Sequence, residues 1–172
     1  MACVVQRPQT LKGEGKERDI RAVNPENKYE RIRLKNQLCF PLYACAKEVV
    51  RRYREPLEKL GLTYTQYVVM MAFWEFGGMS EKEVGEKVHL DSGTLAPLLK
   101  RLEKQGYVRR VRPENNERVL FVTLTEAGEA LKEEALKVPD SMKGCIDLPD
   151  EELWELKKLL DKALSKMGRT KE

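Results

Sequence analysis

The chain has 172 residues and a formal net charge of +4; 41% of its residues are hydrophobic and 35% are charged. This length suits one domain with a sizeable core, and the composition is typical of a soluble, helix-rich protein. No apolar run is long enough to cross a bilayer, and the N-terminus lacks an apolar secretion signal. We therefore expect a cytoplasmic protein without a membrane partner.

The cysteines argue against a metal centre. Cys3, Cys39, Cys45 and Cys145 contain no Cys-x-x-Cys pair, and His89 is the one histidine of the chain. A zinc site needs ligands in closer pattern, and structural disulfides are rare in the cytoplasm. We expect neither a metal ion nor a cofactor.

The N-terminal third divides into an arm and a helix. Residues 1–28 are polar and show no hydrophobic periodicity, which predicts a flexible arm; being net basic, it could alternatively touch nucleic acid. Apolar residues then recur every three or four positions over 33–60, which predicts one long amphipathic helix. Pro41 leaves two possibilities, a helix that begins near Leu38 or a helix kinked near its start.

Two capping boxes and one strong cap open the next helices. Residues 63–66 and 80–83 match the capping-box pattern, and the first box opens a helix that ends at Gly77. The second opens a short helix, and Asp91 then caps a longer one that ends before a left-handed terminator at Gly106. A short helix, a tight turn and a longer helix form a helix-turn-helix pattern.

The longer helix has two different faces. The buried face repeats at helical spacing and consists of Leu95, Leu98, Leu99 and Leu102. The outer face is small, hydroxylic or basic, with no acid, and carries Ser92, Thr94, Ala96, Pro97, Lys100 and Arg101. Such a face can approach an anionic surface closely, as a recognition helix in the DNA major groove must.

A hairpin follows the recognition helix. Residues 107–112 and 118–124 are rich in β-branched and aromatic residues around a turn-rich segment, which predicts a two-stranded wing. Between residues 100 and 118 there are seven Lys or Arg and three Glu, a local basic footprint whose alternative interpretation is a solvated charged face. The wing cations are Arg109, Arg110, Arg112 and Arg118.

Two more helices complete the chain. Thr125 caps a helix whose apolar face runs to Val138, and Pro149 begins a last helix with a wide apolar stripe to Met167. A winged helix needs neither the first nor the last helix, so we expect their apolar faces to be buried in a two-fold homodimer. Such a dimer presents two recognition helices to a pseudo-palindromic, double-stranded DNA operator.

The expected fold is therefore mainly α with a small β-hairpin: a winged helix-turn-helix with long N- and C-terminal dimerisation helices. Residues 63–125 form the DNA-binding domain. The helical dimerisation region consists of residues 29–62 and 126–168.

The order of these elements resembles the MarR family of bacterial transcription regulators over residues 33–168. Three stretches are similar to its organic-hydroperoxide-sensing, OhrR-like branch. They are residues 38–43 (Leu-Cys-Phe-Pro-Leu-Tyr), residues 62–67 (Leu-Thr-Tyr-Thr-Gln-Tyr) and residues 90–101, the last nearly residue for residue.

This resemblance implies roles for five residues. Cys39 is implied as the peroxide-reactive cysteine, and Tyr53 and Tyr64 as the tyrosines that hydrogen-bond its sulfur across the dimer. Tyr43, on the helical face of Cys39, matches a further pocket tyrosine, and Arg118 matches an arginine that enters the minor groove. Peroxides are attacked by thiolates, and the first turn of a helix favours an anion, which suits a cysteine just before Pro41.

The resemblance also implies a trapping step. Cys145 lies near the position of the resolving thiol in two-cysteine members, so oxidation could produce a Cys39–Cys145 disulfide between subunits. The alternatives are a buried or incidental Cys145 and trapping by a low-molecular-weight thiol. The sequence departs from the family in Pro41, in the extra thiol Cys45 and in its longer N-terminal arm.

The sequence thus predicts a DNA-binding regulator, in the sense of a repressor, that senses organic hydroperoxide through Cys39 and then releases its operator. The DNA contacts are expected from Ser92, Thr94, Pro97, Lys100, Arg101, Arg110 and Arg118. One alternative is release by a small phenolic or apolar ligand, with Cys39 structural. Another is a thiol peroxidase; we expect no enzyme, because no acid–base set surrounds Cys39 and an enzyme does not need a recognition helix.

Overall fold

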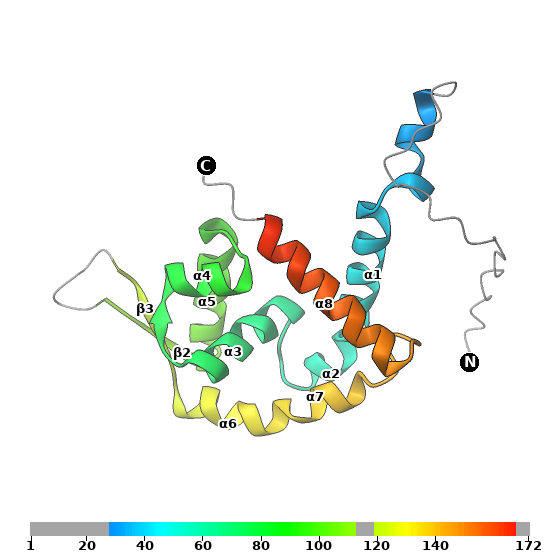
Figure 1. Ribbon diagram of the computed structural model, residues 1–172. Helices are drawn as coiled ribbons and strands as arrows, with labels where there is room; N and C mark the ends of the chain where they lie inside the picture. Colours follow the sequence, from blue (N-terminus) through cyan, green and yellow to red (C-terminus); the bar gives the residue numbers. More distant parts are fainter. Residues whose placement is uncertain (1–27, 113–118, 168–172) are drawn as a thin grey trace. The chain divides into compact units, whose positions relative to one another are not determined.

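The computed structural model describes residues 28–112 and 119–167 (Figure 1). The chain divides into two compact units, Met1–Cys45 and Ala46–Glu172. None of the helices in these described ranges is both long and apolar enough to span a membrane. The predicted arm lies almost entirely outside the described residues, as does Arg118 near the predicted tip of the wing.

The N-terminal helix begins where one of the two interpretations of Pro41 places it. Two short 3-10 helices come first, η1 (Lys28–Ile32) and η2 (Leu34–Asn36), and α1 spans Cys39–Arg52. The amide of Leu42 donates to the carbonyl of Leu38 at 3.5 Å. Pro41 therefore lies in the first turn, where a missing N–H removes no intrahelical hydrogen bond. A start near Leu38 is confirmed, and the earlier start at residue 33 is wrong.

The predicted single helix to residue 60 is also wrong at Tyr53. There α1 ends, and the short helix α2 (Arg54–Glu58) follows. Pro56 explains the interruption, because it lacks an N–H and its ring clashes with the carbonyl four residues earlier, that of Arg52.

The same rule divides the helix predicted to run to Val138. Helix α6 (Glu126–Ala135) ends four residues before Pro139, and Val138 belongs to the next helix, α7 (Lys137–Ser141). The cap at Thr125 is confirmed, since its hydroxyl accepts from the amide of Gly128 at 3.0 Å.

The helix-turn-helix elements are α3 (Tyr64–Phe76), α4 (Glu81–Val88) and α5 (Ser92–Lys104). Both predicted capping boxes are complete, at Thr63 and at Ser80. Asp91 accepts from the amide of Thr94 at 2.9 Å, and Gly106 has the expected left-handed backbone, with φ +82°. The predicted start and stop of the recognition helix are therefore confirmed.

The wing contains one strand more than the predicted hairpin. Strands β2 (Val108–Val111) and β3 (Phe121–Leu124) pair as expected, and β1 (Met79–Ser80) pairs with the other edge of β3. All pairs are antiparallel, and β3 lies in the middle. Gly78 permits this approach, because a Cβ at that position would lie 2.8 Å from the methyl group of Thr123.

The buried face of α5 lies in the core of the unit Ala46–Glu172. Leu95, Leu98, Leu99 and Leu102 are between 0 and 8% exposed, as the periodicity predicted. They belong to one apolar cluster with side chains from α2, α3, α4, α6, α7 and the sheet. Helices α4 and α5 contact each other, and α5 also contacts β2 (Figure 1). By contrast, α8 (Asp150–Met167) buries none of its residues within one chain.

At Gly128 the backbone of α6 lies close against the backbone of Tyr107. A Cβ there would lie 2.0 Å from the carbonyl oxygen of Tyr107, and the Gly128 carbonyl accepts from the indole N–H of Trp74 at 2.9 Å. We expect Gly128→Ala to lower the free energy of unfolding by about 1–3 kcal/mol through overpacking, although helix propensity alone favours alanine by about 1 kcal/mol.

Urea denaturation measures this change. Ala130→Gly is the control, because Ala130 is exposed on the same helix and reports the propensity term alone. A Gly128→Ala protein more stable than the parent would contradict the packing described for α6.

Candidate functional site

The two tyrosines predicted for the sensor lie together at the junction of three helices. Tyr53 lies between α1 and α2, and Tyr64 is the first residue of α3. Their ring centroids are 5.0 Å apart with the planes tilted by 59°. Tyr67, one turn along α3, extends the cluster at 6.1 Å from Tyr53, and Trp74 lies 6.2 Å from Tyr67. Tyr67 was not among the residues predicted for the sensor. Its spacing of three residues from Tyr64 places both on one face of α3 and could have indicated it.

Burial raises the pKa of two of these phenols. Burial, and after it the neighbouring Tyr64, Tyr67 and Cys145, raise the pKa of Tyr53 above its ordinary value; burial and then Tyr64 raise the pKa of Tyr67. Within the part of the chain that the structure describes, the hydroxyls of Tyr53 and Tyr64 have no hydrogen-bond partner. Two phenol hydroxyls are therefore available to an acceptor that comes from elsewhere, such as a thiolate.

Cys145 lies beside Tyr53, in an open hollow of about 580 Å³. Four cationic residues, Arg51, Arg52, Arg54 and Lys143, contribute to the lining. The thiol is free and partly exposed.

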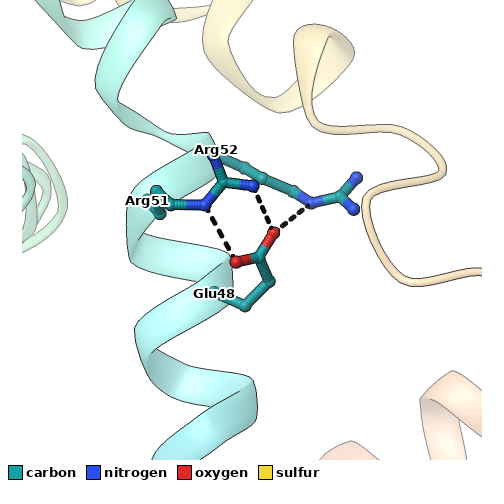
Figure 2. Close-up of polar contacts among 3 residues, drawn as sticks. All are labelled: Glu48, Arg51 and Arg52. Carbon is teal, nitrogen blue, oxygen red and sulfur yellow. Dashed lines mark hydrogen bonds and ion pairs between the residues drawn. The ribbon is translucent and has the colours of Figure 1, made fainter. Parts of the chain in front are cut away.

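A carboxylate holds two of these arginines in place (Figure 2). Glu48 pairs with Arg51 through contacts of 2.7 and 2.9 Å and with Arg52 at 3.3 Å. The hydrogen bond from Arg51 is the main reason that the pKa of Glu48 falls to about 2, with Arg52 contributing. The guanidinium groups at the rim of the hollow are therefore ordered by the end of α1.

Cys39 and Tyr43 are exposed one turn apart at the start of α1. Cys39 is the first residue of the helix, in agreement with a start near Leu38 that places it in the first turn. Both residues belong to the unit Met1–Cys45, whereas Tyr53, Tyr64 and Cys145 belong to the unit Ala46–Glu172. Cys45, the extra thiol, is exposed on the same helix.

The outer face of α5 is open along its length. The exposed residues of the predicted DNA contact are Ser92, Thr94, Pro97, Lys100 and Arg101. No acid interrupts this face, because Asp91 lies before the first turn and Glu103 turns toward the wing, where it binds Arg110. A helix of this kind is compatible with close contact to a phosphate backbone and to base edges.

Thr94 also hydrogen-bonds the N-cap of α5, which limits how it can contact DNA. Its hydroxyl donates to Asp91 at 2.8 Å, which together with the amide of Thr94 lowers the pKa of Asp91. The hydroxyl proton is therefore occupied, and phosphates offer acceptors alone. In this arrangement Thr94 can meet DNA through its methyl group or as an acceptor, whereas Ser92 and the two cations can donate.

Arg110 is held by the recognition helix. Its guanidinium donates to Glu103 at 2.7 and 2.8 Å, and its backbone amide donates to the same carboxylate at 3.1 Å. These bonds join β2 to α5 and lower the pKa of Glu103. The sequence did not indicate this pair, because seven positions and a turn separate the two residues. Arg110 stays a predicted DNA contact, and the structure adds its role in positioning the wing.

The chain is similar to known transcription regulators. Residues 51–135 match the family described as transcriptional regulator SarA/Rot. Over 135 residues the chain is 44% identical to the organic hydroperoxide resistance transcriptional regulator of Bacillus subtilis, covering 78% of this chain and 92% of that protein.

Two solved proteins share the fold. Reduced AbfR of Staphylococcus epidermidis bound to DNA has a TM-score of 0.68 at 34% identity, covering 81% of this chain and 97% of its own. AbfR is also known overoxidised on DNA and in a disulfide form. A cysteine-to-serine variant of MarR from Escherichia coli, complexed with operator DNA, has a TM-score of 0.69 at 25% identity, covering 80% of this chain and 99% of its own.

The Glu103–Arg110 pair gives a prediction about stability and pH. Glu103 is 36% exposed and Arg110 is 20% exposed, so we expect Glu103→Gln to lower the free energy of unfolding by about 0.5–1 kcal/mol at pH 7. The folded-state pKa lies below the ordinary 4.5, so the stabilisation is present above pH 4.5 and is lost as the pH falls through the folded value.

Urea denaturation at pH 7 and at acid pH tests this. The matched control is Glu129→Gln, whose partner Lys132 is 3.9 Å away on the same helix. Equal losses for the two variants, or a Glu103→Gln loss that does not shrink in acid, would show that the pair does not hold the wing.

Proposed function

Because this chain belongs to the MarR/SarA family of transcription regulators, we propose that it is a dimeric repressor that senses organic hydroperoxide through Cys39 and then releases its DNA operator. The family consists of regulators rather than enzymes. The observation that carries the proposal is the 44% identity to the Bacillus subtilis organic hydroperoxide regulator across 92% of that protein, in a chain with an exposed cysteine at the start of α1. The proposed place of action is the cytoplasm.

The proposed DNA contact is the outer face of α5. Ser92 and Pro97 permit close approach, Lys100 and Arg101 supply positive charge, and Asp91 fixes the first turn. The wing adds Arg110 and Arg118, the latter predicted to enter the minor groove. Relatives crystallised on DNA support this assignment.

The proposed dimer buries the apolar residues that one chain leaves exposed. On α8 the side chains of Trp154, Leu159, Leu164 and Met167 are between 52 and 77% exposed. In the N-terminal segment the comparable residues are Ile32, Leu34, Leu38 and Phe40, between 41 and 75% exposed. Surfaces of this kind mark interaction sites, and a two-fold dimer would present two α5 helices to a pseudo-palindromic operator.

The proposed sensing reaction begins at the Cys39 thiolate. Its sulfur attacks one peroxide oxygen, the O–O bond breaks, and the other oxygen leaves as the alcohol after taking up a proton. The sulfur is now a sulfenic acid, and Tyr43, Tyr53 and Tyr64 are the pocket residues proposed to surround it. The thiolate of Cys145 of the partner subunit then attacks this sulfur, forming the S–S bond and breaking the S–O bond; the hydroxide that leaves takes up a proton from solvent and becomes water. The disulfide form of AbfR supports this trapping step.

Peroxide-dependent release of DNA tests the sensor. We expect an organic hydroperoxide to weaken operator binding by the wild-type protein at least tenfold and to leave Cys39→Ser bound, because serine forms no sulfenic acid. Gel-shift titration on the protein's own upstream DNA measures both affinities.

The matched control is Cys45→Ser, which removes another exposed thiol from α1 and should respond as the wild type does. Release of Cys39→Ser by peroxide would contradict the assignment. A Cys45→Ser protein that no longer responds would move the sensor to Cys45.

The salt dependence of operator binding tests the recognition face. Each phosphate contact releases about one counterion, so we expect Arg101→Ala to weaken binding and to reduce the slope of log K against log salt by about 1. Fluorescence anisotropy at several salt concentrations measures this slope.

Arg54→Ala is the comparison, because it removes the same charge from an exposed site on α2. We expect it to leave the slope unchanged. Identical slopes for all three proteins would exclude Arg101 from the interface.

A further inference from the structure

The end of the recognition helix is hydrogen-bonded to the loop between α2 and α3, which lies between the two proposed sensor tyrosines in the sequence. The side chain of Gln105, the residue after α5, donates to the carbonyl of Gly61 at 2.8 Å and accepts from the side chain of Gln66 at 2.9 Å. The hydroxyl of Tyr107 donates to the carbonyl of Leu60 at 3.5 Å. We call the side chains of Gln66, Gln105 and Tyr107, with these two carbonyls, the loop–helix latch.

Gln66 ties the latch to the first turn of α3. It is 6% exposed and is the polar side chain found buried among the described residues. Its amide oxygen accepts from the backbone N–H of Thr63 at 2.8 Å and from the Thr63 hydroxyl at 3.0 Å. Its amide nitrogen donates to Gln105. Both ends of this amide are engaged, so Gln66 connects Thr63 to Gln105 through hydrogen bonds.

The same loop lies between the two tyrosines. Residues 59–63 connect α2 to α3; Tyr53 precedes α2 and Tyr64 directly follows Thr63. The rings contact each other at 5.0 Å, so a change at either ring acts on the loop from both sides. All these residues lie in the unit Ala46–Glu172.

We propose that the loop–helix latch transmits the state of the tyrosine pair to the recognition helix, with Gln105 as its positioning residue. This inference rests on the proposed peroxide sensing. A larger, oxidised sulfur displaces Tyr53 and Tyr64, the loop follows, and Gln105 and Tyr107 move the end of α5. Packed elements respond as units, because the core does not deform continuously. Proximity alone does not establish such a connection. The experiment therefore measures how oxidation changes DNA affinity with and without the latch.

The test separates DNA binding from its response to oxidation. The double variant Gln105→Met and Tyr107→Phe removes all side-chain bonds from the end of α5 to the loop and preserves chain length and shape. Gln105 is exposed and Tyr107 is partly exposed, so the fold should persist. Operator Kd is measured for reduced and peroxide-treated protein, and mass spectrometry measures the oxidised fraction of Cys39.

Thr125→Val is the matched control. The Thr125 hydroxyl donates to the carbonyl of Gly106, so it also binds the end of α5, but from α6 instead of the loop. This variant also loses the cap of α6, and its Tm should fall. It controls for loss of stability and for loss of a bond to the helix end.

We expect the latch variant to bind the operator within about threefold of wild type when reduced, and to oxidise Cys39 to the same extent. Its ratio of oxidised to reduced Kd should be at least tenfold smaller than the wild-type ratio. The Thr125→Val ratio should equal that of the wild type. Release of the latch variant equal to wild type would overturn the latch alone, whereas a wild type that peroxide does not release would overturn the sensing and the latch together.

Hydrogen exchange provides a readout without DNA. The amides of Gly106 and Tyr107 donate to the carbonyls of Glu103 and Leu102, and they report the order of the helix end. We expect oxidation to change their exchange in the wild type and to leave it unchanged in the latch variant. The same change in both proteins would overturn the inference even if the latch variant bound DNA poorly.

Discussion

The burial of four leucines on one face of α5 is the constraint on which the rest of the structure depends. Leu95, Leu98, Leu99 and Leu102 are nearly inaccessible to solvent, so the opposite face must point outward. The hydrogen bonds at the two helix ends, at Asp91 and at Gly106, fix its length. Because the interior is close-packed, the helix moves with the core rather than independently of it. A regulator of this design can control DNA affinity by moving a whole domain by a small amount.

The proposed sensor and the proposed DNA interface consist of chemically different groups. The tyrosine pair supplies two phenol hydroxyls as donors, and burial and then Tyr64 raise the pKa of Tyr53. The interface supplies cations and small side chains on a rigid helix. Between them lies a short loop whose carbonyls bind the end of that helix. A free-energy change of about 1.4 kcal/mol alters an affinity tenfold, so in the proposed dimer a small displacement of the two α5 helices would be enough for release.

Local sequence signals predicted most of the helices and strands. Contacts between residues far apart in the sequence were not predicted. The caps at Thr63, Ser80, Asp91 and Thr125 depend on residues within one turn, and the structure has all four. Pro56 and Pro139 explain the two helix breaks. The breaks were not predicted, because the apolar periodicity continues past both prolines. Strand β1 was missed because its two residues overlap the cap of α4. The pairs Glu103–Arg110 and Gln66–Gln105 arise from tertiary packing. The periodicity of a single segment does not predict such pairs.

Oxidation of the protein while it is bound to DNA tests whether release depends on Cys39. Protein bound to operator DNA is treated with less than one equivalent of organic hydroperoxide, the bound and released fractions are separated, and the sulfur of Cys39 is identified in each by mass spectrometry. We expect a reduced Cys39 in the bound fraction and Cys39 in a disulfide in the released fraction. The same oxidation state of Cys39 in both fractions would contradict it, because release would then not depend on this sulfur.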